Sequence, residues 1–194
     1  MNIHKIALLE GDGIGPEIAR EAVKVLQAIE GAGKAKFKIT SAPFGGSAYF
    51  SHGHSFPEET KAVCDEADAI IKGPIGLSKA ESDKIPVEEQ PERGALLPLR
   101  RRYDTFANFR PVYLPKGVQH FSPLRPEVVG DGIDIMMIRE LVGGLYFGSK
   151  ERGEKEGKRY VNEMLEYDED QIRRIMHIAF KEAQSRTKTL HNVH

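Results

Sequence analysis

Hydrophobic and polar residues alternate in blocks along the first third of the chain. Short apolar runs at residues 3–9, 37–43 and 69–72 predict buried strands. Between these runs, apolar residues recur at helical spacing over residues 16–31, which open with a proline suited to a first helical turn, and residues 57–67 predict a second helix. Strands that alternate with helices in this way predict a parallel sheet and α/β architecture.

The middle of the chain predicts a loop, a helix and two longer strands. Residues 78–92 are polar or charged and include two prolines, which favours a surface loop. Residues 95–103 are expected to be helical. Residues 107–114 and 133–141 are expected to form strands, and the second of these is the strongly apolar run IDIMMIREL.

The last part of the chain predicts a hairpin and a helix. Residues 145–147 and 158–165 are expected to form the two arms of the hairpin, with residues 149–157 as a solvated tip. Asp168 is a natural N-cap for a helix that reaches about Arg186. The apolar face of this helix is expected to hold Ile172, Ile175, Met176, Ala179 and Ala183. Residues 187–194 resemble the beginning of another strand.

The composition fits a soluble globular protein and excludes several classes of partner. Of the 194 residues, 40% are hydrophobic and 29% are charged, and the formal net charge is −1. This balance gives no whole-chain attraction to nucleic acid or to an acidic membrane. No apolar run approaches the ~18 residues of a membrane span, and no leader is recognisable, so a cytoplasmic location is expected. The single Cys64 excludes an internal disulfide framework.

Isolated histidines and the cysteine give weak signals for a metal or nucleophile site. His52 and His54 lie in a segment that we expect to be a glycine-bearing loop, where solvated side chains are the simpler interpretation. Cys64 falls in the predicted helix over residues 57–67 and is expected at the core or its boundary.

The glycine-rich segment at residues 11–17, GDGIGPE, has two interpretations. It follows a predicted strand and precedes a helix, as a dinucleotide-binding turn does, but Pro16 stands where the third glycine of G-x-G-x-x-G belongs. One interpretation is a tight structural turn. The other is a set of backbone N–H groups at the helix start that face a ligand beyond the strand ends.

Three arginines in separate motifs predict an anion site. Arg100 and Arg110 flank a short helix and strand, and Arg139 follows the strand IDIMMI, a typical active-site location in open α/β sheets. The planar guanidinium pairs with a carboxylate through two hydrogen bonds. Leu96 and Leu97 stand one helical turn before Arg100 and add an apolar wall. Surface salt bridges remain the alternative for the arginines taken singly.

Tyr146 follows the third arginine motif and is a candidate proton donor. Packing of its ring is the alternative interpretation.

Three motifs together carry a family resemblance. In order and spacing, GDGIGPE, QPERGALLPLRRRYDTFANFRP at residues 90–111 and RELVGGLYFG at residues 139–148 resemble the 3-isopropylmalate dehydrogenases. This group belongs to the β-hydroxyacid oxidative decarboxylases, with the isocitrate, homoisocitrate and tartrate dehydrogenases. The resemblance implies an isopropylmalate-dehydrogenase-like α/β fold. It places a parallel-sheet first domain at residues 1–100 and part of a second domain, with a dimerisation hairpin, at residues 101–194.

The resemblance also implies roles for individual residues. Arg100, Arg110 and Arg139 would bind the malate carboxylates and hydroxyl, and Tyr146 would protonate the enolate left by decarboxylation. Leu96 and Leu97 match the pocket for the isopropyl group, where isocitrate-preferring relatives carry polar residues. The residues implied to contact the cofactor NAD are Ile14, Gly73, Pro74, Ile75, Gly76 and Glu92. A divalent metal, Mg²⁺ or Mn²⁺, would polarise the ketone intermediate.

The implied reaction is the NAD-dependent oxidative decarboxylation of 3-isopropylmalate to 4-methyl-2-oxopentanoate in leucine biosynthesis. In the family, the catalytic lysine and the metal-binding aspartates follow the position of His194, so the chain alone is expected to be truncated and inactive. We expect a homodimer or association with a full-length subunit. The alternatives are a non-catalytic remnant that binds a dicarboxylate and a relative that acts on tartrate or malate.

Overall fold

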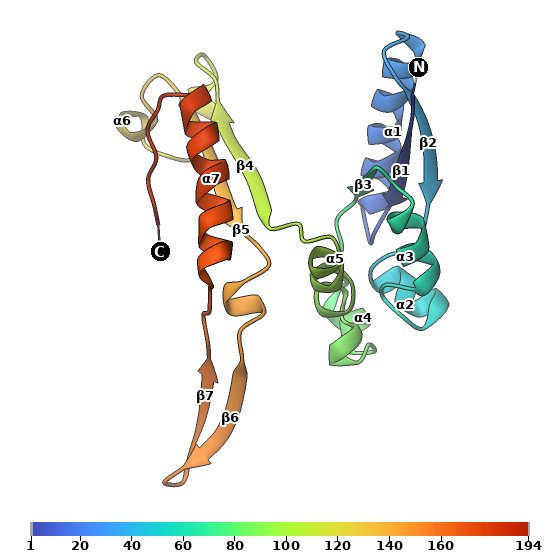
Figure 1. The fold of residues 1–194 in the computed structure, drawn as a ribbon, viewed down its shortest axis with the longest axis vertical. Coiled ribbons are helices and arrows are strands. Elements are labelled where there is room, and N and C mark those ends of the chain that lie inside the picture. The colour runs from blue at the N-terminus through green and yellow to red at the C-terminus, as the bar shows by residue number, and fades with distance from the viewer. Residues whose placement is uncertain (1, 194) are drawn as a thin grey trace. The chain divides into compact units, whose positions relative to one another are not determined.

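The computed structural model describes residues 2–193, and the chain divides after Arg102 into two compact units (Figure 1). Each unit has its own sheet and helices, and each is described by itself. Among residues 2–193, no helix combines the length and the apolar character needed to cross a membrane.

The first unit is built on a three-stranded parallel sheet in the order β2-β1-β3. Its strands are β1 (Ile3–Leu9), β2 (Lys36–Ser41) and β3 (Ala69–Lys72). The central strand β1 carries four consecutive buried residues from Ile6 to Leu9, as a strand covered on both faces requires. The prediction of α/β architecture with a parallel sheet is confirmed.

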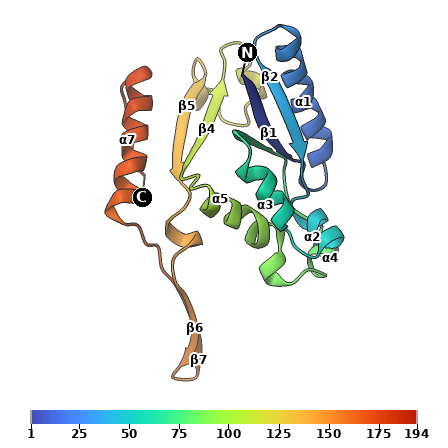
Figure 2. The same cartoon turned by 45° about the vertical axis from the view of Figure 1, so that its right-hand side comes forward.

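Helices connect the strands of the first unit. The longer ones are α1 (Gly15–Gly31), α2 (Gly46–His52), α3 (Glu58–Asp65) and α5 (Leu97–Arg102). Figure 2 shows α1 running alongside β1 and β2. Between β1 and β2, Pro16 lies in the first turn of α1 and Ala19 is buried. The core of the unit includes Phe44 and Phe56, whose rings meet edge to face with centroids 5.4 Å apart.

Two expectations for the first unit were wrong. His52 is the last residue of α2 rather than part of a loop, and its Nε2 lies 3.1 Å from the carboxylate of Glu59. Residues 78–92 are not one surface loop, because they contain α4 (Lys79–Ser82), which a Ser78–Glu81 capping box stabilises. Two further short turns follow α4, η1 (Val87–Glu89) and the π-helical η2 (Pro91–Leu96). Cys64 is buried in α3, in agreement with its expected place in the core.

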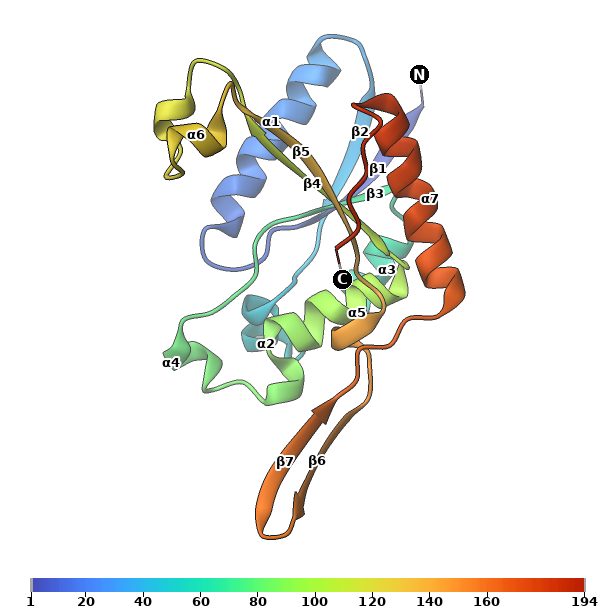
Figure 3. The same ribbon diagram turned by 90° about the vertical axis from the view of Figure 1, so that its left-hand side faces the viewer.

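The second unit is an antiparallel strand pair covered on one face by a helix. Strands β4 (Ala107–Leu114) and β5 (Ile133–Glu140) pair along their whole length, and α7 (Glu169–Ser185) packs against β5 (Figure 3). The side chain of Asp168 accepts a hydrogen bond from the backbone N–H of Gln171, which confirms the predicted N-cap. Shorter elements complete the unit: η3 (Gln119–Phe121), α6 (Pro126–Val129) and η4 (Gly144–Tyr146).

The apolar face of α7 is narrower than its sequence suggests. Ala179 is buried, and Ile175, Met176 and Ala183 are half-buried, but Ile172 is 51% exposed. Ion pairs supplement the apolar contact between α7 and β5, because Arg174 reaches Glu140 and Arg186, just past the end of α7, reaches Asp134. Ile172, which the sequence places on the apolar face of the helix, therefore lies outside the buried part of that face.

A two-stranded hairpin projects from the second unit (Figure 1). Its arms are β6 (Lys150–Lys155) and β7 (Lys158–Glu163). The expected first arm at residues 145–147 is wrong, since these residues overlap η4, and the segment expected as the tip forms the arm instead. Glu156 and Gly157 both have positive φ, 54° and 74°, as a tight two-residue hairpin turn requires.

The base of the hairpin is closely packed. A Cβ atom added at Gly148 would lie 1.9 Å from the backbone oxygen of Met164, so only glycine fits there. The backbone N–H of Met164 donates to the oxygen of Ser149 at 3.0 Å, directly beyond this contact.

Residues 187–193 form no strand, which corrects the expectation for the end of the described chain. A strand needs a neighbour that accepts its backbone hydrogen bonds, and no such neighbour pairs with these residues in the described part of the chain. His194, which also belonged to that expectation, lies outside the described residues.

Candidate functional site

Arg110 and Arg139 lie on the same face of the β4–β5 strand pair. Asn108 is directly opposite Arg139 in the register, and Arg110 follows two residues later on the same strand. Because alternate residues of a strand point to the same side, the side chains of Arg110, Asn108 and Arg139 share one face. The two arginines are diagonal neighbours, a spacing that long side chains bridge.

Each of these arginines is supported by one neighbouring side chain. Nε of Arg110 donates a hydrogen bond of 2.7 Å to Oδ1 of Asn108. The guanidinium carbon of Arg139 lies 5.5 Å from the centroid of the Tyr146 ring, within the range of a cation–π contact. Both arginines remain exposed. The face therefore presents two oriented, solvent-accessible guanidinium groups, which suits an anion with two carboxylates.

Tyr146 is brought to this face by the turn that follows β5. It ends the short helix η4 and is 36% exposed, with its ring against Arg139. The contact places its ring beside Arg139, so both interpretations of Tyr146, packing partner and proton donor, are compatible with its position.

Arg100 lies in the first unit, with the two leucines of the predicted apolar wall. Leu96 ends η2, Leu97 begins α5, and both are half-buried, as Arg100 is. Helical residues three or four apart are neighbours on the surface, so Leu96 and Leu97 lie beside Arg100. Leu99 anchors the helix, with only 8% of its surface exposed. The candidate site residues thus form two groups, one in each unit.

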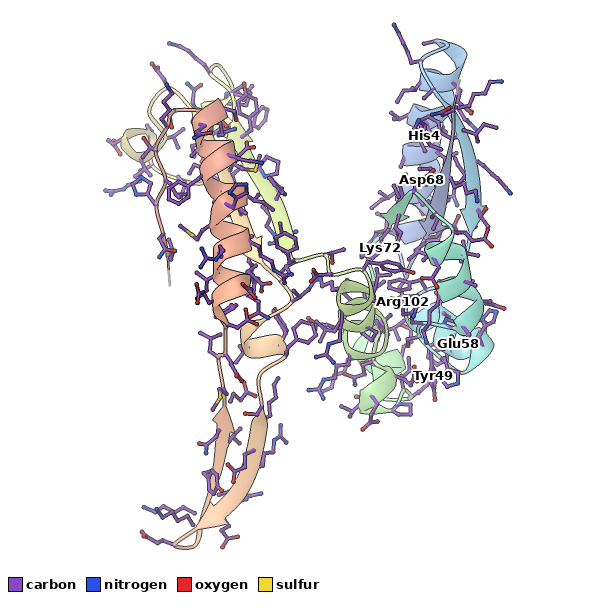
Figure 4. The ribbon with its side chains drawn as sticks, viewed as in Figure 1. His4, Tyr49, Glu58, Asp68, Lys72 and Arg102 are labelled. Atoms are coloured by element: carbon purple, nitrogen blue, oxygen red, sulfur yellow. The ribbon has the colours of Figure 1, made fainter. Side chains whose placement is uncertain are left out.

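Lys72 is a charged residue near Arg100 that was not predicted from the sequence. It ends β3 (Figure 4) and is half-buried. Its Nζ donates a hydrogen bond of 2.7 Å to the backbone oxygen of Gly73. Burial lowers the pKa of Lys72, and the nearby positive charge of Arg100 lowers that pKa further. The sequence feature that could have indicated Lys72 is its place at the end of an otherwise apolar strand, AIIK.

Replacing Lys72 by methionine is expected to stabilise the protein near pH 7. A lysine whose pKa is lowered in the folded state favours unfolding while it is protonated, and this penalty disappears as the pH rises through the lowered pKa towards 10.5. Because the side chain is only half-buried, solvent screening limits the gain to about 1–2 °C in melting temperature. Thermal unfolding followed by circular dichroism at pH 7 and pH 10 measures both effects.

The exposed Lys36 of β2 provides the matched control for this substitution. Lys36→Met removes the same charge from the same sheet without removing a half-buried ammonium group. Two results would contradict the view that the charge of Lys72 destabilises the folded state. One is an equal gain in melting temperature for Lys36→Met and Lys72→Met, and the other is a gain for Lys72→Met that persists at pH 10.

Asp12 organises the glycine-rich turn from inside the first unit. Its carboxylate accepts hydrogen bonds from the backbone N–H groups of Gly46 (3.0 Å), Ser47 (2.8 Å) and Gly76 (3.0 Å). The residue is 4% exposed. One buried side chain thereby joins the turn after β1 to the start of α2 and to the segment after β3.

The glycines of the turn permit close backbone contacts. A Cβ atom at Gly11 would lie 2.1 Å from the oxygen of Pro74, and one at Gly15 would lie 2.1 Å from the oxygen of Glu10. Gly73 is equally crowded by Glu10, at 2.0 Å. The tight-turn interpretation of GDGIGPE therefore accounts for these glycines.

The same packing brings most of the expected cofactor residues together. The backbone N–H of Asp12 donates to the oxygen of Pro74 at 2.9 Å, which sets the turn containing Ile14 beside residues 73–76 at the carboxyl edge of the sheet. Ile14 is 59% exposed there. Glu92 is an exposed residue of η2. In the described part of the chain, no three acidic, histidine or cysteine side chains gather as a metal site would require.

Comparisons with known proteins agree with these motifs. The isocitrate/isopropylmalate dehydrogenase family matches residues 5–194. A 3-isopropylmalate dehydrogenase of Desulfotalea psychrophila is 44% identical over 184 residues, which are 94% of this chain and 51% of that protein. A 3-isopropylmalate dehydrogenase of Aliivibrio fischeri is 44% identical over 98% of this chain and 52% of its own length. The chain thus spans about half the length of these relatives.

Solved structures show the same fold. An isocitrate dehydrogenase from Methylococcus capsulatus superposes with a TM-score of 0.73 at 24% identity, over 94% of this chain and 48% of that one. A beta-decarboxylating dehydrogenase from Thermococcus kodakarensis superposes with a TM-score of 0.62 at 23% identity, over 95% of this chain and 46% of its own. From the family match over nearly its whole length, this chain belongs to the isocitrate/isopropylmalate dehydrogenase family.

Proposed function

We propose that the chain binds 3-isopropylmalate and forms part of an NAD-dependent enzyme that converts it to 4-methyl-2-oxopentanoate in leucine biosynthesis. The observation that carries this proposal is the pair Arg110 and Arg139, oriented on one face of β4–β5 by Asn108 and Tyr146. The similarity to 3-isopropylmalate dehydrogenases at 44% identity supports the choice of substrate within the family.

The substrate has two carboxylates and one branched apolar group, and the candidate residues match both features. The guanidinium groups of Arg110 and Arg139, on β4 and β5, bind carboxylate oxygens, and the family resemblance assigns the same role to Arg100 of α5. Leu96 and Leu97 provide the apolar surface for the isopropyl group. A substrate with a third carboxylate, such as isocitrate, would meet apolar side chains there instead of a charged partner.

Tyr146 holds the proton that the reaction finally needs. Its ring lies against the guanidinium of Arg139, so a substrate bound to Arg139 lies near the phenol. The hydroxyl donates its proton to the carbon that has lost its carboxylate as CO₂. Arg139 thereby both binds the substrate and orients the proton donor.

The proposed cofactor site lies at the carboxyl edge of the parallel sheet. When bound, NAD accepts the hydride from the hydroxyl-bearing carbon. The exposed Ile14 offers an apolar contact, and a Cβ atom added at Gly76 would meet no atom within 4 Å, so the backbone there can approach a ligand closely. Glu92 and residues 73–75 complete the proposed contacts. The side chains of residues 2–193 do not provide a cluster of ligands that fits Mg²⁺ or Mn²⁺.

The hairpin is the proposed contact with a second subunit, either another copy of this chain or a longer homologue. Strands β6 and β7 form an isolated ribbon, and a two-stranded ribbon is marginally stable in water without a covering surface. Val161 of β7 is 57% exposed and would be buried by such a partner.

Isothermal titration calorimetry with 3-isopropylmalate tests the proposed function. We expect saturable binding by the 194-residue chain, weaker binding of malate, which lacks the isopropyl group, and no binding of isocitrate at the same concentrations. NADH formation in the presence of NAD and Mn²⁺ is measured in parallel. Binding without NADH formation is the expected result for the chain alone, and NADH formation would contradict the expectation that it is inactive. The absence of any binding contradicts the proposal.

A further inference from the structure

The carboxylate of Glu140 is nearly enclosed at the end of β5, on the opposite face of the strand from Arg139. Its side chain is 8% exposed. Oε2 accepts hydrogen bonds from the backbone N–H groups of Val142 (3.0 Å) and Gly143 (2.8 Å). A single carboxylate oxygen thus fixes two successive peptide N–H groups of the turn that leads to Tyr146.

The other oxygen of Glu140 faces Arg174 of α7. Nη2 of Arg174 lies 3.4 Å from Oε1 of Glu140, and Nη1 donates to Oδ2 of Asp104 at 2.7 Å. The guanidinium carbon is 4.2 Å from the centroid of the Phe106 ring, which precedes β4. Arg174 therefore contacts Asp104, Glu140 and Phe106.

Packing against α7 leaves the turn little alternative space. The backbone N–H of Gly144 donates to the oxygen of Glu166 at 2.9 Å. Cβ atoms added at Gly143 and Gly144 would lie 2.7 Å from Oε1 of Gln171 and 2.3 Å from the hydroxyl of Tyr167. The turn is held by Glu140 on one side and by the beginning of α7 on the other.

We propose that Glu140, anchored by Arg174, is a positioning residue that sets Tyr146 against Arg139. The connection runs from α7 through the Glu140 carboxylate to the turn at residues 141–144, and from there directly into η4. Glu140 has no role in binding the substrate itself. The proposal rests on the proposed function in treating Tyr146 and Arg139 as parts of the substrate site.

Fluorine NMR of the chain labelled with 3-fluorotyrosine tests the position of Tyr146 without any ligand. Tyr146→Phe assigns its resonance among those of the six tyrosines. Glu140→Gln removes the charge that faces Arg174 and is expected to shift or broaden the Tyr146 signal. It is also expected to weaken binding of 3-isopropylmalate about tenfold, because small displacements of a site cost affinity and rate steeply.

Asp134→Asn is the matched control. Asp134 pairs with Arg186 across the same boundary between β5 and α7, but at the opposite end of the strand from the turn. If Glu140 only holds α7 against β5, Glu140→Gln and Asp134→Asn should change the Tyr146 signal and the affinity equally. Positioning predicts that Asp134→Asn leaves both the Tyr146 signal and the affinity unchanged.

Arg174→Lys keeps the charge on α7 and provides a second variant if Glu140→Gln does not fold by circular dichroism. We expect the Tyr146 signal to move in the same direction by a smaller amount. An unchanged Tyr146 signal in either folded variant overturns the proposal. A wild-type chain that does not bind 3-isopropylmalate contradicts the proposed function instead, since the fluorine signal requires no ligand.

Discussion

Replacing Arg139 by glutamine is expected to lower the affinity for 3-isopropylmalate by roughly 30- to 150-fold. The substitution removes a charge-assisted, two-point contact with a carboxylate, which contributes about 2–3 kcal/mol. It also removes the cation that faces the Tyr146 ring. Arg139→Lys retains the charge but not the planar group that forms two hydrogen bonds with a carboxylate, and about a tenfold loss of affinity is expected. Calorimetry measures the three affinities under one buffer condition.

Arg173→Gln is the matched control for Arg139→Gln. Arg173 lies in α7 of the same unit, is exposed, and pairs with Glu169 one helical turn away. Its removal changes the net charge of the chain by the same amount. Equal losses for Arg139→Gln and Arg173→Gln would mean that the substrate responds to overall charge, and the assigned site would then be wrong.

Replacing Asp12 by alanine is expected to lower the free energy of unfolding of the first unit by about 3 kcal/mol. Three backbone N–H groups lose their acceptor, and each unsatisfied buried donor costs about 1–3 kcal/mol, with water relieving the more exposed ones. Gly45, whose φ is 91°, lies directly against this carboxylate, and the Cβ atom of any larger residue there would clash with it. Urea unfolding followed by circular dichroism measures the loss.

Asp68→Ala serves as the control for Asp12→Ala. The carboxylate of Asp68 also accepts one backbone N–H bond, from Lys5 at 2.8 Å, but it does so at an exposed position. A loss of about 0.5–1 kcal/mol is expected there. If the two variants lose the same stability, the junction at Asp12 does not hold the three segments together.

Elements with a strong local pattern were predictable from the sequence. The runs that became β1, β3 and β4 have the observed bounds, and the N-cap of α7 is visible as an aspartate before an apolar helical face. The helix α2 was not predictable in this way. Its first N–H groups are satisfied by Asp12, 34 and 35 residues earlier in the chain, and no local cap marks its start.

The first arm of the hairpin and the contacts that support the site were not predicted, for related reasons. Strand β6 reads KERGEK, which lacks the apolar alternation of a half-buried strand because both of its faces are largely exposed. The three arginines were identifiable from their motifs. The contacts that support the site, such as Asn108 on Arg110 and Arg174 on Glu140, depend on strand register and helix docking, which no local sequence pattern shows.

Gly148 separates the hairpin, which tolerates changes of sequence, from the segment around η4, which does not. Where the backbone at Gly148 passes the backbone at Met164, there is room for the hydrogen atom of a glycine but not for a Cβ atom. Beyond that crossing, the arms of the hairpin can lengthen, shorten or exchange residues around the turn at Glu156 and Gly157 without disturbing η4. Related chains are therefore free to diverge in whatever surface they present at the hairpin while the geometry around Tyr146 stays constant.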